Sequence, residues 1–174
     1  MNKNILQQNY YQLFDLPQSF MLDMTALKSK MRTLQQEYHP DNFANDSELS
    51  TLALSISSYI NHAYNTLLNP LTRAIYLLEL AKITVDLVHD TKFTPEFLFK
   101  QIELRESIEE AESASDIDAL EEIEQQLKDE ADNLVVTINQ YFAVQQYNEI
   151  IELIKQLSFY DKLLQVVDRT LSNL

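Results

Sequence analysis

The sequence predicts an all-α protein, and two features of its composition carry this prediction. The 174 residues include no glycine and only four prolines. Glycine is the usual residue in tight hairpins and phosphate-binding loops, so its absence argues against a β-sheet protein, a P-loop or a dinucleotide-binding turn. Leu, Glu, Gln and Ala are abundant instead, and these residues favour helix.

The first two helices follow from apolar residues at helical spacing. A short helix, rich in tyrosine and leucine, is expected just before Pro17. A longer helix is expected over about residues 24–38, because its apolar residues recur every three or four positions and Asp23 can cap it. Pro40 ends this helix, because a proline pushes the preceding residue out of the α region.

Two more helices complete the N-terminal half. A polar stretch at residues 41–47 is expected to be a loop, and a third helix then covers residues 49–67. Pro70 fits the first turn of a fourth helix that runs to Leu80. We therefore predict an N-terminal domain over residues 1–80, built around a helical hairpin.

The C-terminal half is predicted to be a three-helix bundle. Residues 81–93 read as a linker, and residues 94–96 (Thr-Pro-Glu) form a good helix start. The Ser-Ala-Ser stretch at 113–115 is expected to end that helix, with Ser115 capping the next one, whose apolar stripe begins at Ile117. Short loops between three helices suggest an antiparallel bundle over residues 94–174.

Cysteine content and charge exclude several classes of protein. The chain has no cysteine, so it has no disulfide framework and no thiolate nucleophile or ligand. It shows no apolar signal core and no apolar run as long as a membrane span, so a cytoplasmic protein is expected. The net charge is −14, and residues 81–174 hold eight basic and twenty acidic residues. Phosphate backbones would repel such a chain, which argues against nucleic-acid binding.

The most informative residues are His39, Pro40 and Asp41, at the junction between a helix and a polar loop. Pro40 fixes its own φ and restricts His39, so the two polar side chains are held in place before a partner arrives. On these residues alone, an ordinary turn, a binding loop and half of a catalytic or metal site remain open. No nucleophile elbow and no Glu-x-x-His pair accompanies them.

Three separated segments resemble the J-domain family over residues 9–68. These are Tyr-Tyr-x-Leu-Phe at 10–14, Tyr-His-Pro-Asp at 38–41 and Ile-Asn-x-Ala-Tyr-x-x-Leu at 60–67. The resemblance implies that His39, Pro40 and Asp41 engage a DnaK-like chaperone and stimulate its ATP hydrolysis. It also implies that the basic face of the preceding helix docks on an acidic surface of that partner; its members are Lys28, Lys30 and Arg32. Asn42 stands where the family commonly has lysine, which favours a specialised partner.

The C-terminal half carries more apolar residues than one bundle seam requires. On the helix that begins at Thr94, three of them lie off the main stripe beside two glutamates: Leu98, Phe99 and Ile102, with Glu103 and Glu106. On the last helix, Phe159, Leu163 and Val166 lie beside the stripe in the same way. Two interpretations stay open: these residues widen the core or pack on the N-terminal domain, or they form an exposed patch for a protein partner.

Four segments spread over nearly the whole chain resemble the HscB family, the J-type co-chaperones of iron–sulfur cluster assembly. They cover residues 60–64, 69–78, 97–106 and 159–163, and the Glu-Leu-Arg-Glu run within the third is especially diagnostic. The resemblance implies a bundle that binds the scaffold protein IscU and delivers it to the chaperone HscA. The positions that match the family's scaffold-binding patch are Leu98, Phe99, Ile102 and Phe159, with Glu103 and Glu106 as a polar rim.

The expected protein is therefore a bacterial co-chaperone, monomeric, with no catalytic site, metal or cofactor of its own. A bacterial type is implied because the cysteine-rich metal module of some eukaryotic relatives is missing. Three rivals are kept: a general J-domain protein with another client, an enzyme using the acidic residues of 103–132 as a divalent metal site, and a plain helical scaffold protein. The second rival draws on thirteen acidic residues scattered around helices.

Overall fold

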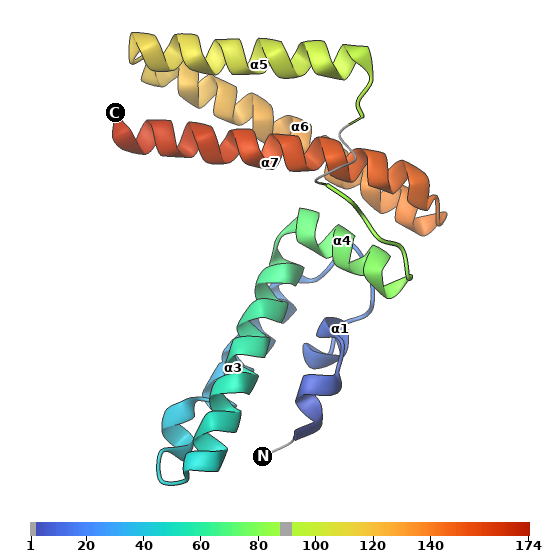
Figure 1. Ribbon diagram of the computed structural model, residues 1–174, viewed down its shortest axis with the longest axis vertical. Coiled ribbons are helices and arrows are strands. Elements are labelled where there is room, and N and C mark those ends of the chain that lie inside the picture. Colours follow the sequence, from blue (N-terminus) through green and yellow to red (C-terminus); the bar gives the residue numbers. More distant parts are fainter. Residues whose placement is uncertain (1–2, 88–91) are drawn as a thin grey trace. The chain divides into compact units, whose positions relative to one another are not determined.

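The computed structural model describes residues 3–87 and 92–174, and within them all regular structure is α- or 3₁₀-helix (Figure 1). This agrees with the all-α prediction. The chain divides into two compact units, Met1–Ile83 and Thr84–Leu174. None of the helices in the described ranges is long and apolar enough to cross a membrane.

The N-terminal unit is organised around its longest helix. Its elements are η1 (Lys3–Gln7), α1 (Tyr10–Leu13), α2 (Met24–Glu37), η2 (Pro40–Phe43), α3 (Ser47–Leu68) and α4 (Pro70–Leu80). Every other element of the unit packs against α3, whose inward face carries Ile56, Ile60 and Ala63, all fully buried. The apolar stripe of α2 buries Leu27 and Leu34 in the same unit, as its helical spacing predicts. No sequence pattern indicated η1.

A buried arginine, Arg73, connects three segments of the N-terminal unit. Arg73 of α4 is 3% exposed, and its guanidinium donates a hydrogen bond of 2.9 Å to the carbonyl of Leu67 at the end of α3. The same group lies 5.1 Å from the ring centroid of Phe20, a cation–π contact. Burial lowers the pKa of Arg73. The arginine thus joins α4, the end of α3 and the segment before α2.

The C-terminal unit is a bundle of α5 (Pro95–Ala114), α6 (Ile117–Ala143) and α7 (Tyr147–Asn173), in which each helix packs against the other two (Figure 1). Its core draws on all three helices: Phe97, Leu104, Ile108, Ala111, Leu120, Leu127, Phe159, Tyr160, Leu163 and Val167. Thr94 caps α5 as predicted, because its hydroxyl accepts a hydrogen bond from the backbone N–H of Phe97 at 3.3 Å. Of the predicted linker, residues 88–91, with His89, lie outside the described residues.

The junction between α5 and α6 corrects two predictions. Ser115 does not cap α6; it ends α5 in the left-handed conformation, with φ of 52°. Asp116 caps α6 instead, because its carboxylate accepts a hydrogen bond from the backbone N–H of Ala119 at 3.0 Å. A chain without glycine must place another residue at the left-handed end of a helix, and this moves the cap by one position. Ile117, expected on the core stripe, is 47% exposed.

Candidate functional site

The corner between α2 and α3 is built by a proline-started 3₁₀ turn. The stretch predicted as a loop contains η2, which begins at Pro40 and is capped by His39 in an extended conformation. The backbone N–H of Asp41 donates to Nδ1 of the His39 ring at 3.3 Å. In the neutral ring with this hydrogen bond, Nε2 carries the proton, so the imidazole offers a hydrogen-bond donor.

Neighbouring side chains hold this corner against the two helices. The amide of Asn42 donates to the backbone carbonyl of Gln36, in the last turn of α2, at 2.8 Å. Tyr38 is 5% exposed and anchors the end of α2 in the unit, and burial, together with Glu37, raises its pKa. Asn42, where the family commonly has lysine, therefore has a structural role as a clamp between the turn and α2.

The polar groups of the corner face solvent. The side chains of His39 and Asp41 are 58% and 88% exposed, and His39 Nδ1 lies 3.6 Å from a carboxylate oxygen of Asp41. Pro40 is half-buried. The arrangement offers an imidazole and a carboxylate on a stiffened turn, which is suited to hydrogen bonding with a partner's polar groups.

The three basic residues of α2 differ in their exposure to solvent. Lys28 and Arg32, four residues apart, are exposed and line one shallow hollow on the surface of α2. Lys30 is half-buried and does not line this hollow. The face formed by Lys28 and Arg32 can attract an acidic partner surface, and such charge complementarity mainly raises the association rate.

The predicted patch on α5 is exposed. Leu98, Phe99 and Ile102 are 44%, 68% and 53% exposed, and Glu103 and Glu106 beside them are exposed as well. Apolar side chains this exposed and this close together on one helix are typical of a binding surface.

The structure corrects the prediction that Phe159 on α7 is exposed. Its side chain is 7% exposed and belongs to the bundle core, where its ring makes an edge contact with Phe97 at a centroid distance of 5.5 Å. Leu163 is buried in the same core, whereas Val166 is 42% exposed. The structure thus brings three of the four predicted apolar residues to the surface and buries Phe159 in the core, against Phe97 of α5. The reason is that α7 packs against both other helices and buries a wider arc than one stripe.

A polar link holds α5 on the rest of the bundle, and no sequence pattern indicated it. Lys100 pairs with Glu130 of α6 at 2.5 Å, and its ammonium lies 5.8 Å from the ring centroid of Tyr160 on α7. Burial lowers the pKa of Lys100, but hydrogen bonds to Glu130 and Tyr160 raise it, and the net shift is upward. Since these residues are far apart in sequence, only the tertiary structure reveals the link that positions the patch.

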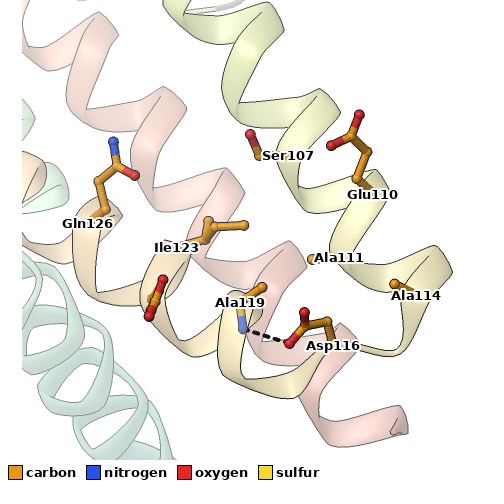
Figure 2. Close-up of a pocket in the computed structure, with 9 residues that line it drawn as sticks. Ser107, Glu110, Ala111, Ala114, Asp116, Ala119, Ile123 and Gln126 are labelled. Carbon is orange, nitrogen blue, oxygen red and sulfur yellow. Dashed lines mark hydrogen bonds between the residues drawn. The ribbon is translucent and has the colours of Figure 1, made fainter.

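The acidic residues of 103–132 do not converge on a metal. Three of them line a hollow of about 590 Å³ between α5 and α6, namely Glu110, Asp116 and Glu122 (Figure 2). The Asp116 carboxylate is already engaged as the α6 cap, the dashed contact in Figure 2. Among the residues that the structure describes, no group of three or more His, Cys, Asp or Glu side chains is placed to hold a metal ion.

Comparisons with known proteins identify relatives of this chain along nearly its full length. Residues 93–168 match the family model described as the HSCB C-terminal oligomerisation domain. A "Co-chaperone protein HscB homolog" of Neisseria meningitidis serogroup C is 38% identical over 155 residues, which cover 88% of this chain and 93% of that protein. One of Azoarcus sp. strain BH72 is 33% identical over 171 residues, 97% of each chain.

The solved structures that resemble this chain are also structures of co-chaperones. Chaperone HscB from Vibrio cholerae is 35% identical with a TM-score of 0.85, and the match covers 96% of this chain and 99% of that one. Human co-chaperone HscB is 27% identical with a TM-score of 0.87, covering 96% of this chain and 84% of that one. The yeast co-chaperone Jac1, at 20% identity and a TM-score of 0.72, shares the fold.

Proposed function

Because the chain belongs to the HscB family of co-chaperones, which are not enzymes, we propose that it delivers an IscU-type iron–sulfur scaffold protein to an HscA-type chaperone and stimulates ATP hydrolysis by that chaperone. The relatives compared above are mostly bacterial proteins, which supports a role in the bacterial cytoplasm. The observation that carries the proposal is that the chain has two separate exposed surfaces, one on each unit.

The first surface stimulates the chaperone. His39 and Asp41 are presented by a turn that Pro40 and Asn42 hold against α2. Little conformational entropy is lost when such a turn docks, and Lys28 and Arg32 favour approach to an acidic ATPase surface. We assign residues 1–80 as the J-domain and this corner as the part that triggers hydrolysis.

The second surface holds the client. Leu98, Phe99 and Ile102 supply exposed apolar area on α5, and Glu103 and Glu106 form a polar rim around it. Burying such side chains contributes about 1–3 kcal/mol each, from which docking costs are subtracted. We expect a dissociation constant of roughly micromolar order, which suits a delivery step. Phe159, which is buried in the bundle core, supports α5 through its contact with Phe97.

Because one chain carries both surfaces, client delivery is followed by ATP hydrolysis in the chaperone, although this chain itself catalyses no reaction. A scaffold bound to the C-terminal unit is held at an effective concentration on the order of millimolar near the chaperone that the J-domain engages. Hydrolysis then closes the chaperone on the protein that has just been delivered. The chain is expected to act as a monomer, and light scattering in solution checks this.

A steady-state ATPase assay tests the proposal. Stimulation by this protein is measured on an HscA-type chaperone with and without an IscU-type scaffold. The His39→Gln variant should lose stimulation, because glutamine cannot reproduce the imidazole at the corner, and should keep its helical content and its affinity for the scaffold. Retained stimulation by the variant would contradict the role of the corner.

The same assay distinguishes the proposed function from two of its rivals. Stimulation of DnaK in place of the HscA-type chaperone, with no response to the scaffold, would indicate a general J-domain protein with another client. If the protein stimulated neither chaperone, the remaining interpretation would be a plain helical scaffold protein.

A further inference from the structure

The two basic residues of α5, Lys100 and Arg105, both lie over aromatic rings of α7. The ammonium of Lys100 is 5.8 Å from the ring centroid of Tyr160. The guanidinium of Arg105 is 5.7 Å from the ring centroid of Phe159. A cation within about 6 Å of a ring centroid is attracted by the face of the ring. Since the two rings belong to consecutive residues, one short segment of α7 holds α5 by two contacts of the same kind.

The two cations flank the buried face of α5. They are five residues apart, which places them about 140° apart around the helix axis. The buried residues of α5 all fall in the arc between them: Phe97, Leu104, Ile108 and Ala111. At the centre of this arc the ring of Phe97 makes edge contacts with Phe159 at 5.5 Å and with Tyr160 at 6.0 Å between centroids. A rotation of α5 about its axis, in either direction, would therefore carry one cation away from its ring.

Burial of apolar residues specifies the rotation of α5 poorly. A helix normally takes its orientation from one apolar stripe that faces the core. The first two turns of α5 instead carry apolar residues on both sides, because Phe97 is buried while three others are exposed: Leu98, Phe99 and Ile102. Turning Leu98 or Phe99 inward would remove more apolar area from water, which is favourable. Another interaction must therefore keep these side chains facing outward.

The charges of Lys100 and Arg105 supply that interaction. The side chain of Lys100 is 35% exposed and its ammonium is also paired with Glu130 of α6 at 2.5 Å, while Arg105 is exposed. Each cation therefore keeps contact with solvent while it lies over its ring. If α5 turned, one of the two charges would move toward the core, where a charged group is unfavourable. The pair of cations thus opposes rotation in both directions.

We propose that Lys100 and Arg105 are positioning residues, which fix the rotation of α5 and so present Leu98, Phe99 and Ile102 to the client. Their role in client binding rests on the proposed function. The rotation of α5, however, is a property of the free protein and can be measured without any scaffold.

Thiol labelling of the whole chain measures this rotation, because the protein has no cysteine of its own. Leu98→Cys and Phe99→Cys each introduce one thiol, and the two positions lie about 100° apart around α5. The rate of reaction with excess water-soluble maleimide reports the exposure of each thiol. A rotation of α5 slows one reaction and speeds the other, whereas local unfolding of the helix speeds both.

The two cations should give opposite results when each is replaced by methionine. Arg105→Met extends the apolar face toward position 98, so the thiol of Leu98→Cys should react about threefold more slowly and that of Phe99→Cys faster. Lys100→Met extends the apolar face toward position 99 and should reverse both changes. A variant that merely lost stability would change neither rate or raise both.

Conservative variants and a matched control complete the labelling series. Arg105→Lys and Lys100→Arg keep a cation over each ring, so both thiols should react at the rates found without these changes. Lys128→Met removes a cation that pairs with Glu124 within α6 at 2.8 Å, and it should alter neither rate.

Isothermal titration with an IscU-type scaffold separates this inference from the proposed function. Arg105→Met and Lys100→Met should each raise the dissociation constant about three- to tenfold, because the apolar surface is turned. Rates at positions 98 and 99 that stay unchanged, or that rise together, would overturn the positioning role and leave the proposed function intact. Opposite rate changes in a protein that does not bind the scaffold would support the positioning role and overturn the proposed function. If a methionine variant lost its helical content, the corresponding glutamine variant would decide by the same criterion.

Discussion

At the scale of single residues, exposure separates side chains that bind from side chains that support. The family resemblance groups Leu98 and Ile102 with Phe159, yet the first two are about half exposed and Phe159 is 7% exposed. A helical spacing pattern gives the angle of a residue around its own helix, and it does not give the width of the arc that a neighbouring helix covers. Phe159 lies within that arc.

This difference predicts opposite phenotypes on the two helices. The double change of Leu98→Ala and Ile102→Ala should weaken scaffold binding about tenfold or more and change the free energy of unfolding by less than about 1 kcal/mol, because the side chains are exposed. Phe159→Ala should lower the free energy of unfolding by about 3–5 kcal/mol, as expected for an aromatic residue in a core.

Titration calorimetry and chemical denaturation of the same samples measure both quantities. If Phe159→Ala kept the wild-type stability, the placement of this ring in the core would be wrong. If the double variant bound the scaffold normally, α5 would not be the client surface.

At the scale of elements, the absence of glycine has structural consequences. Among the residues that the structure describes, four adopt a positive φ although none of them is glycine: Asp15, Lys82, Ser115 and Gln145. The left-handed conformation costs a residue with a Cβ about 1 kcal/mol relative to glycine. These helix ends are therefore made with residues that are suboptimal for a positive φ; at one of them Ser115 ends α5, and the next residue, Asp116, caps α6.

Substitution by glycine should consequently stabilise one helix end and destabilise a helix interior. Ser115→Gly should raise the free energy of unfolding by about 0.5–1 kcal/mol, equivalent to roughly 1–4 °C in Tm for a chain of this size. Ser113→Gly, two residues earlier and still within α5, is the matched control and should lower stability by a similar amount. Differential scanning calorimetry compares them, and a Ser115→Gly variant that melts below the wild type would contradict the reasoning.

The elements themselves were largely predictable, for reasons that can be named. Asp23, Pro40, Pro70 and Thr94 mark helix starts or ends through local hydrogen bonds and fixed dihedral angles, and such signals act within a few residues. The 3₁₀ helix η1 and the link of Lys100 to Glu130 and Tyr160 were not predictable. They depend on contacts between segments that are distant in the sequence.

At the scale of the whole molecule, tyrosines with raised pKa values occur in both units and couple stability to alkaline pH. Burial is the largest cause for Tyr10, Tyr11 and Tyr76 in the first unit and for Tyr160 in the second. In the unfolded chain these phenols ionise near their ordinary pKa of 10.0. The unfolded state therefore loses protons first, and the stability present below pH 10 is lost as the pH rises further.

The largest single contribution should come from Tyr11, whose hydroxyl is buried without a partner in the described structure. The Tyr11→Phe variant should be as stable as the wild type or more stable at pH 8, because an unpaired buried hydroxyl is removed. Its free energy of unfolding should then fall less steeply between pH 10 and 11. Urea denaturation at a series of pH values measures this, and an unchanged slope would show that Tyr11 does not carry the effect.

The sequence by itself determined the helical class, most helix boundaries, and the corner at His39 with its chemical groups, because these depend on composition and on interactions between near neighbours. Only the tertiary structure decided which side chains are buried at the bundle interface. It placed Phe159 in the core, paired Lys100 of α5 with Glu130 of α6, and brought Arg105 of α5 over the ring of Phe159 on α7. The physical reason is that burial and cavity formation are set by the packing of helices distant in sequence, and spacing along one helix does not encode that packing.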